Sequence, residues 1–142
     1  MKPEAVKNIA DYALMQASSR LDRVAYQMGA SRKSKSPETV HDLRVSIRRF
    51  MSCLIVYPQF FPDKDSKKIR KRLKKVMKAA GEVRDRDIAL HLGKAASLPK
   101  ESPVIDGLRR QRKQAAKELA ENLQPWSKRN VFPKWRRRLC LS

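Results

Sequence analysis

The sequence predicts an all-α fold, a basic bundle of about four to six helices. Apolar residues recur at steps of three and four, the spacing of one helix face. Proline and glycine separate these segments, and no segment alternates in the way a strand does. With 142 residues, 41% of them hydrophobic, the chain can bury one modest core. We therefore expect a single helical domain over residues 1–142.

The first expected helix ends at Gly29 and is followed by a polar linker, residues 30–36. The second begins at Pro37 with Ser36 as its N-cap and ends before Pro58. Their predicted buried stripes are Val6, Ile9, Ala13, Ala17, Leu21, Val24 and Met28, then Val40, Leu43, Ile47, Phe50, Leu54 and Tyr57.

A third helix is expected over about residues 65–80, with a break or kink at Gly81 and a fourth helix from about Glu82 to Ala96. A fifth helix starts after the cap residue Ser102. Their predicted stripes are Ile69, Leu73, Val76 and Ala80, then Ile105, Leu108, Ala115, Leu119 and Leu123. The tail, residues 126–142, is apolar enough to dock onto the core and is expected to form a last short helix.

Charge is the dominant property of the chain, which carries 34 Lys and Arg against 14 Asp and Glu, a formal net charge of +20. Such a charge costs stability through self-repulsion and favours a polyanionic partner: nucleic acid, an anionic membrane surface or a phosphate polymer. No apolar run is long enough to cross a membrane. The two cysteines do not make a disulfide framework or a metal site, so we expect a cytoplasmic protein without a cofactor.

The stretch "VHDLRVSIRRF" at residues 40–50 places His41, Arg44 and Arg48 within an arc of about 60° beside the apolar stripe. Arg49 lies on another face. On their own these residues are typical of a solvated shoulder beside a core helix.

The third helix favours a binding surface instead. Lys67, Lys71, Lys74 and Lys78 form one stripe, Lys75 widens it, and residues 66–81 contain no acidic residue. Like charges at this spacing destabilise a helix, so a face that served solubility alone would be expected to include glutamates. Arginine and lysine bind phosphate oxygens well, as bidentate forks and as point charges.

The stretch "AAGEVRDRDI" at residues 79–88 adds Arg84, which is expected to reach the same groove, and Asp85 and Asp87, which could hold arginines in place. The sequence has no glycine-rich phosphate loop, no paired histidine ligands and no nucleophile motif. We therefore expect no catalytic residues, no metal site and no enzyme activity.

These two stretches together resemble the CHAD family, the conserved-histidine α-helical domain. His41, Arg44, Val45, Arg48 and Arg49 match its first signature. Gly81, Arg84, Asp85, Asp87 and Ile88 match its second. The resemblance implies a helical domain that binds inorganic polyphosphate without catalysis and that occurs beside triphosphate-processing enzymes or at polyphosphate granules.

Three departures from the family pattern stand out. Met51 replaces a usual arginine, and Arg86 replaces an aliphatic residue. The chain also resembles only the N-terminal half of the usual two-repeat domain. We expect a homodimer to rebuild the full domain.

The resulting prediction is a polyphosphate-binding groove formed by the second, third and fourth helices. Its expected contacts are His41, Arg44, Arg48, Arg49, Lys71, Lys74, Lys75, Lys78 and Arg84. One alternative is a basic helical protein that binds nucleic acid, although aromatic residues, only 6% of the chain, offer few stacking platforms. Others are an accessory to an enzyme that processes polyphosphate or triphosphate, and an adaptor for an acidic protein.

Overall fold

The computed structural model describes residues 9–128 and 130–141, and within these ranges the chain forms helices and no strand. The all-α prediction is therefore confirmed. In chain order the elements are α2 (Ile9–Lys33), α3 (Pro37–Val56), the 3-10 turn η1 (Pro58–Phe60), α4 (Asp63–Ala95), α5 (Pro103–Leu123), the 3-10 turn η2 (Gln124–Ser127) and α6 (Val131–Arg138).

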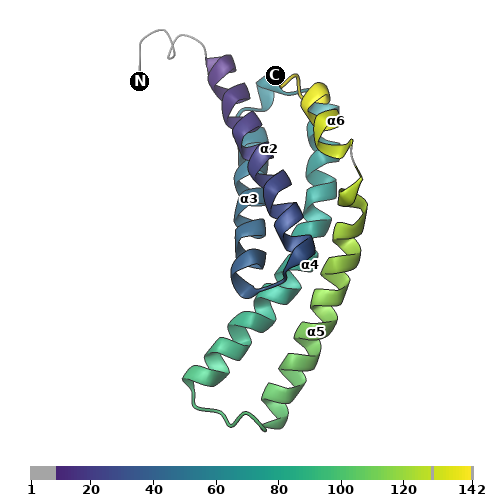
Figure 1. Cartoon of the computed structure of the whole chain (residues 1–142). Coiled ribbons are helices and arrows are strands. Elements are labelled where there is room, and N and C mark those ends of the chain that lie inside the picture. Colours follow the sequence, from purple (N-terminus) through teal and green to yellow (C-terminus); the bar gives the residue numbers. More distant parts are fainter. Residues whose placement is uncertain (1–8, 129, 142) are drawn as a thin grey trace.

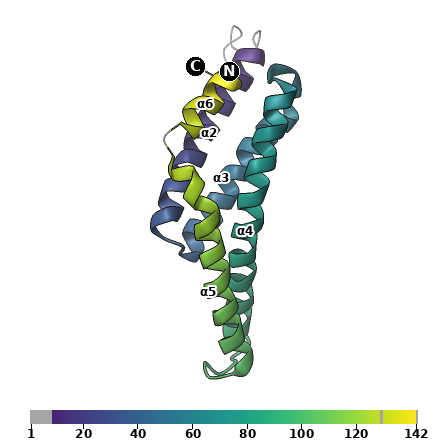
Figure 2. The same cartoon turned by 90° about the vertical axis from the view of Figure 1, so that its right-hand side faces the viewer.

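The helices form two antiparallel hairpins, α2 with α3 and α4 with α5, and packing of α3 against α4 joins the hairpins (Figure 1). The short helix α6 returns to lie beside α2. The α4–α5 hairpin is the longer one and projects beyond the loop that connects α2 to α3 (Figure 2). This projecting end, residues 88–107, is called the tip below.

The apolar stripes of α2 to α5 meet between the two hairpins and form the core, with Phe50 as its largest fully buried side chain. Of the predicted stripe residues, Tyr57 and Leu108 are only partly buried, and Val6 lies outside the described residues. Ile9, predicted to be buried, is 56% exposed because it is the first residue of α2, at the open end of that helix. The rest of the stripes are buried as predicted.

Both predicted N-caps are confirmed. The Ser36 hydroxyl accepts a hydrogen bond from the backbone N–H of Thr39 at 3.2 Å, and the Ser102 hydroxyl accepts one from Val104 at 3.3 Å. A proline occupies the first turn in each case, where its missing N–H costs no helical hydrogen bond. Local sequence therefore determines where α3 and α5 begin.

The predicted stop at Gly29 is wrong, because α2 continues to Lys33. No glycine within the described residues has a positive φ, so Gly29 does not adopt the left-handed conformation that ends helices. Ser31 is fully buried, which extends the buried stripe past the glycine, and Arg32 and Lys33 complement the helix dipole in the last turn. Only residues 34–36 separate α2 from α3.

The predicted break at Gly81 is also wrong, because one 33-residue helix, α4, replaces the expected third and fourth helices. Ala80 and Val83 are both fully buried, so the apolar stripe continues through the glycine and tertiary packing outweighs its low helix propensity. The residues on both sides of Gly81 therefore belong to one continuous helix.

The tail forms the expected short helix, α6, and its described part packs onto the core. Trp126 and Trp135 are buried and contact each other edge-to-face, with ring centroids 5.2 Å apart. The Arg72 guanidinium of α4 lies 4.5 Å from the Trp126 ring centroid, a cation–π contact. Aromatic packing thus fixes this segment against α4.

Candidate functional site

Arg44 is the point at which the two sequence motifs meet. Its half-buried side chain lies over Gly81 of α4, where an added methyl group would lie 3.8 Å from Arg44 Nη2. Arg44 Nε is shielded from solvent and has no hydrogen-bond partner among the described residues. The fold therefore holds a cation between α3 and α4 without an internal acceptor for this N–H group, which is costly unless a ligand or water accepts its hydrogen bond.

The nine predicted site residues share one property. Within the described residues, none of their side chains forms an ion pair or a hydrogen bond with another group of the protein. Several acidic residues lie close to these nine in the sequence, but four acidic side chains form ion pairs with other cations. The ion pairs of the described residues are Lys67–Asp63, Arg86–Glu82, Arg112–Asp87 and Arg136–Asp22.

Asp87 does hold an arginine, but not one of the predicted groove. Its Oδ1 accepts a hydrogen bond from Arg112 Nε of α5 at 3.0 Å, while Asp87 Oδ2 is buried without a partner in the part of the chain that is described. Arg112 also donates to the backbone carbonyl of Lys35 in the α2–α3 loop. The Asp87 and Arg112 side chains are 9% and 23% exposed. This pair therefore anchors the α2–α3 loop to the α4–α5 hairpin.

Arg112 was missed in the sequence, although a signal was present. Arg112 occupies the stripe position between Leu108 and Ala115 on α5, and Asp87 follows Val83 by one helical turn on the stripe of α4. An acid and a base at core-facing positions of neighbouring helices predict a buried pair.

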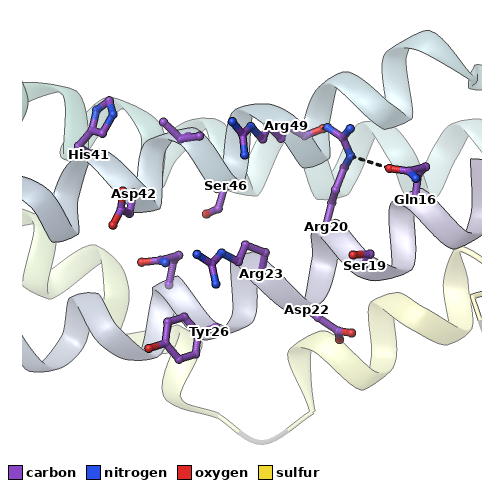
Figure 3. A pocket seen from close by; sticks show the side chains of 12 residues that line it. Gln16, Ser19, Arg20, Asp22, Arg23, Tyr26, His41, Asp42, Ser46 and Arg49 are labelled. Carbon is purple, nitrogen blue, oxygen red and sulfur yellow. Dashed lines mark hydrogen bonds between the residues drawn. The ribbon is translucent and has the colours of Figure 1, made fainter.

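His41 and Arg49 do not lie in a groove with α4. They line a hollow of about 830 Å³ between α2 and α3 (Figure 3). Arg20 and Arg23 of α2 line the same hollow, and Arg20 Nη1 donates to the backbone carbonyl of Arg49 at 3.2 Å. The two α2 arginines were not predicted, because residues 1–30 carry a net charge of only +1 and almost all of the excess positive charge lies in the rest of the chain.

The lysines of α4 also divide between faces. Lys71 lines a hollow of about 550 Å³ against α6, together with Lys134 and Arg138. Lys75 lines another hollow with Glu121 of α5 and Trp126. Lys74, Lys78 and Arg48 are exposed, and Arg84 is half-buried. The predicted single groove is therefore replaced by a basic surface that wraps around α3 and α4.

Within the described residues, no group of three or more His, Cys, Asp or Glu side chains could hold a metal ion. None of the described helices is both long enough and apolar enough to cross a membrane. Burial raises the pKa of the Cys53 thiol, an effect that the positive charge of Arg20 partly offsets.

The comparisons with known proteins bear on this arrangement. Neither the curated proteins nor the solved structures gave a match. A family model described as the CHAD domain matches residues 15–139. This range includes both motifs and all seven named elements except the first residues of α2. The chain belongs to the CHAD domain family.

Proposed function

We propose that this protein binds inorganic polyphosphate without catalysis, through the unpaired cations of α3 and α4. The observation that carries the proposal is that His41, Arg44, Arg48 and their six predicted partners lack internal acids within the described structure. A stable fold does not need to concentrate unpaired positive charge, which destabilises the compact state through self-repulsion. A polyanion with regularly spaced phosphates relieves that repulsion at many points simultaneously.

The arrangement suits a flexible phosphate chain better than a single small anion. Arg44 is half-buried beside Gly81, so its guanidinium has less conformational freedom to lose on binding than a fully exposed one. The exposed lysines Lys74 and Lys78 keep their freedom and follow a flexible polymer as point charges. A half-buried guanidinium fork beside exposed ammonium groups would provide both register and multivalent affinity.

The proposal is tested by replacing Arg44 and Arg48 with glutamine and titrating long-chain polyphosphate at fixed salt. Each lost charged contact is worth about 1.5 kcal/mol or more, so the double variant should bind on the order of a hundredfold more weakly. The matched control is the double variant Arg109→Gln and Arg110→Gln, which removes the same charge from exposed positions on α5. An equal loss in both variants would overturn the assignment of the surface.

The absence of catalysis forms part of the proposal. Polyphosphate incubated with the protein and Mg²⁺ for hours should keep its chain length, as measured by gel electrophoresis and phosphate release. Steady release of phosphate above that of a buffer control would contradict it.

We propose further that two copies associate through the tip. The tip exposes four large apolar side chains, each between 41% and 61% exposed: Ile88, Leu92, Leu98 and Val104. Gly93 allows α4 and α5 to pack closely there, since an added methyl group would lie 2.7 Å from Ile105 Cδ1. The tip is thus a well-packed hairpin with an apolar exterior rather than a loose loop.

Charge favours a second copy as the partner of the tip. The tip, residues 88–107, contains two acidic and two basic residues, a net charge of zero, whereas the whole chain carries +20. Two such strongly basic chains repel each other wherever their basic surfaces meet, but not at a neutral, apolar tip. Twofold association there would leave the basic surfaces of α3 and α4 exposed.

Light scattering at tens of micromolar tests this association. The wild-type protein should be dimeric, and the variant Ile88→Glu with Leu92→Glu should be monomeric. The control variant Ile55→Glu with Val56→Glu makes the same change at equally exposed positions on α3 and should remain dimeric. A monomeric wild-type protein, or a dimeric tip variant, would refute the tip interface.

A further inference from the structure

The hollow between α2 and α3 has features that the polymer surface on α4 does not require. Its walls carry Arg20, Arg23 and Arg49, with His41 at one end. Figure 3 shows the guanidinium groups of Arg23 and Arg49 on either side of Ser46, over the middle of the hollow. Its volume of about 830 Å³ falls in the range of small-molecule sites.

The carboxylates of the hollow do not cancel its positive charge. Asp22 is paired with Arg136 of α6 and is therefore already neutralised. Asp42 lines the hollow near His41 (Figure 3) and forms no ion pair with a described residue. Three guanidinium groups thus face one free carboxylate. Because Asp42 would repel an anion that extended toward it, the hollow suits a compact anion.

Gln27 gives the hollow a polar side chain from α2. Its residue is only 5% exposed, it lines the hollow, and its amide forms no hydrogen bond with any described residue. The amide is not among the solvent-shielded polar groups that lack a partner, so water in the hollow reaches it and a ligand there can take the place of that water. Ser46, also buried and in the hollow, differs because its hydroxyl already donates to the Leu43 carbonyl at 2.8 Å.

We infer that this hollow is a specific site for a short linear oligophosphate of two or three phosphates. Arg23 and Arg49 bind its oxygens from the two walls, and the Gln27 amide donates from α2. Arg20 is a positioning residue that links the two walls of the hollow. Its guanidinium donates hydrogen bonds to the Arg49 carbonyl of α3 and, at 3.5 Å, to Gln16 Oε1 of α2. The inference rests on the proposed phosphate chemistry, since His41 and Arg49 also belong to the predicted polymer contacts.

Calorimetric titration with inorganic tripolyphosphate tests the site. We expect one tripolyphosphate per chain, and about tenfold weaker binding for Arg23→Gln and for Gln27→Leu. The Gln27 variant is decisive because it leaves the net charge unchanged. Ser46→Ala should bind within about twofold of the wild type, since its hydroxyl is already committed to Leu43. Arg109→Gln, which removes one charge outside the hollow, should do the same.

The outcomes separate this inference from the proposed function. If long-chain polyphosphate binds but tripolyphosphate does not, or if Arg23→Gln behaves like Arg109→Gln, the hollow is not a specific site and the polymer proposal stands. If neither ligand binds, both fail. Should Gln27→Leu not fold, as judged by circular dichroism, the comparison of Arg23→Gln with Arg109→Gln decides the matter.

Discussion

The two ends of α4 lie in opposite environments although they belong to one helix. Residues 66–81 of α4 contain eight basic residues and no acidic one. α3 packs against α4 and so joins it to the α2–α3 hairpin. The tip is close to neutral and exposes Ile88 and Leu92 to solvent. The first environment suits a polyanion and the second suits an apolar partner. A single continuous helix therefore carries two surfaces of opposite character.

The junction between the regions is the Asp87–Arg112 pair, which also binds the Lys35 carbonyl. Replacing Arg112 with methionine leaves the buried Asp87 carboxylate unpaired and should lower the free energy of unfolding by about 3 kcal/mol. Urea denaturation measures this. The double variant with Asp87→Asn should recover most of the loss.

Arg110, an exposed residue on the same helix, provides the control for the junction. Its replacement by methionine should change the free energy of unfolding by less than about 0.5 kcal/mol. If both methionine variants lose equal stability, the junction has no special role.

Salt should separate the two binding tasks. Polymer binding on the basic surface should weaken about a hundredfold between about 50 and 200 mM NaCl, if about five phosphates are neutralised. Association through the apolar tip should change little, because burial of apolar surface does not depend on screening. Isothermal titration and sedimentation at the same salt concentrations check both. A dimer that dissociates at higher salt would contradict the assignment of the tip.

The two glycines of α4 should respond differently to replacement by alanine, with smaller effects on stability than the Arg112 variant. Gly81→Ala should stabilise the protein by up to about 1 kcal/mol, because the new methyl group meets Arg44 at an ordinary 3.8 Å and alanine favours the helix. Gly93→Ala should lose that gain or reverse it, because its methyl group would lie 2.7 Å from Ile105 Cδ1. Thermal unfolding distinguishes them, and equal stabilisation would refute tight packing at the tip.

The smallest expected effect concerns Cys53. Burial raises the pKa of its thiol, so the folded protein keeps its proton at alkaline pH where the unfolded chain would release it. The folded state should therefore lose a little stability as pH rises past the ordinary thiol pKa. Iodoacetamide should modify exposed Cys140 well before Cys53, as measured by mass spectrometry. Equal rates of modification would contradict the burial.

Local signals in the sequence predicted the fold well. The caps Ser36 and Ser102 and the apolar stripes identified the fold class and most of the helices. Glycine misled twice, at Gly29 and Gly81, because a buried stripe that continues past a glycine stabilises the helix more than the glycine weakens it. The propensity of a single residue does not include tertiary packing, so it could not predict that these two helices continue.

The nine predicted site residues stay a prediction, to which the structure adds their arrangement around α3 and α4. The motifs do meet, through Arg44 and Gly81, as a groove between neighbouring helices requires. Helix geometry could not tell which neighbour each face of α3 meets, so His41 and Arg49 were placed beside α4 instead of α2. Arg20 and Arg23 were missed because they line the hollow only when α2 packs beside α3, and the sequence does not show that packing.

The basic surface is expected to recognise a phosphate polymer and not the bases of a nucleic acid. Competition measures this most directly: labelled long-chain polyphosphate bound to the protein is challenged with single-stranded RNA, and separately with duplex DNA, at equal phosphate concentration. We expect that neither nucleic acid displaces most of the polyphosphate, whereas unlabelled polyphosphate does. Displacement by RNA or DNA as complete as that by unlabelled polyphosphate would contradict it.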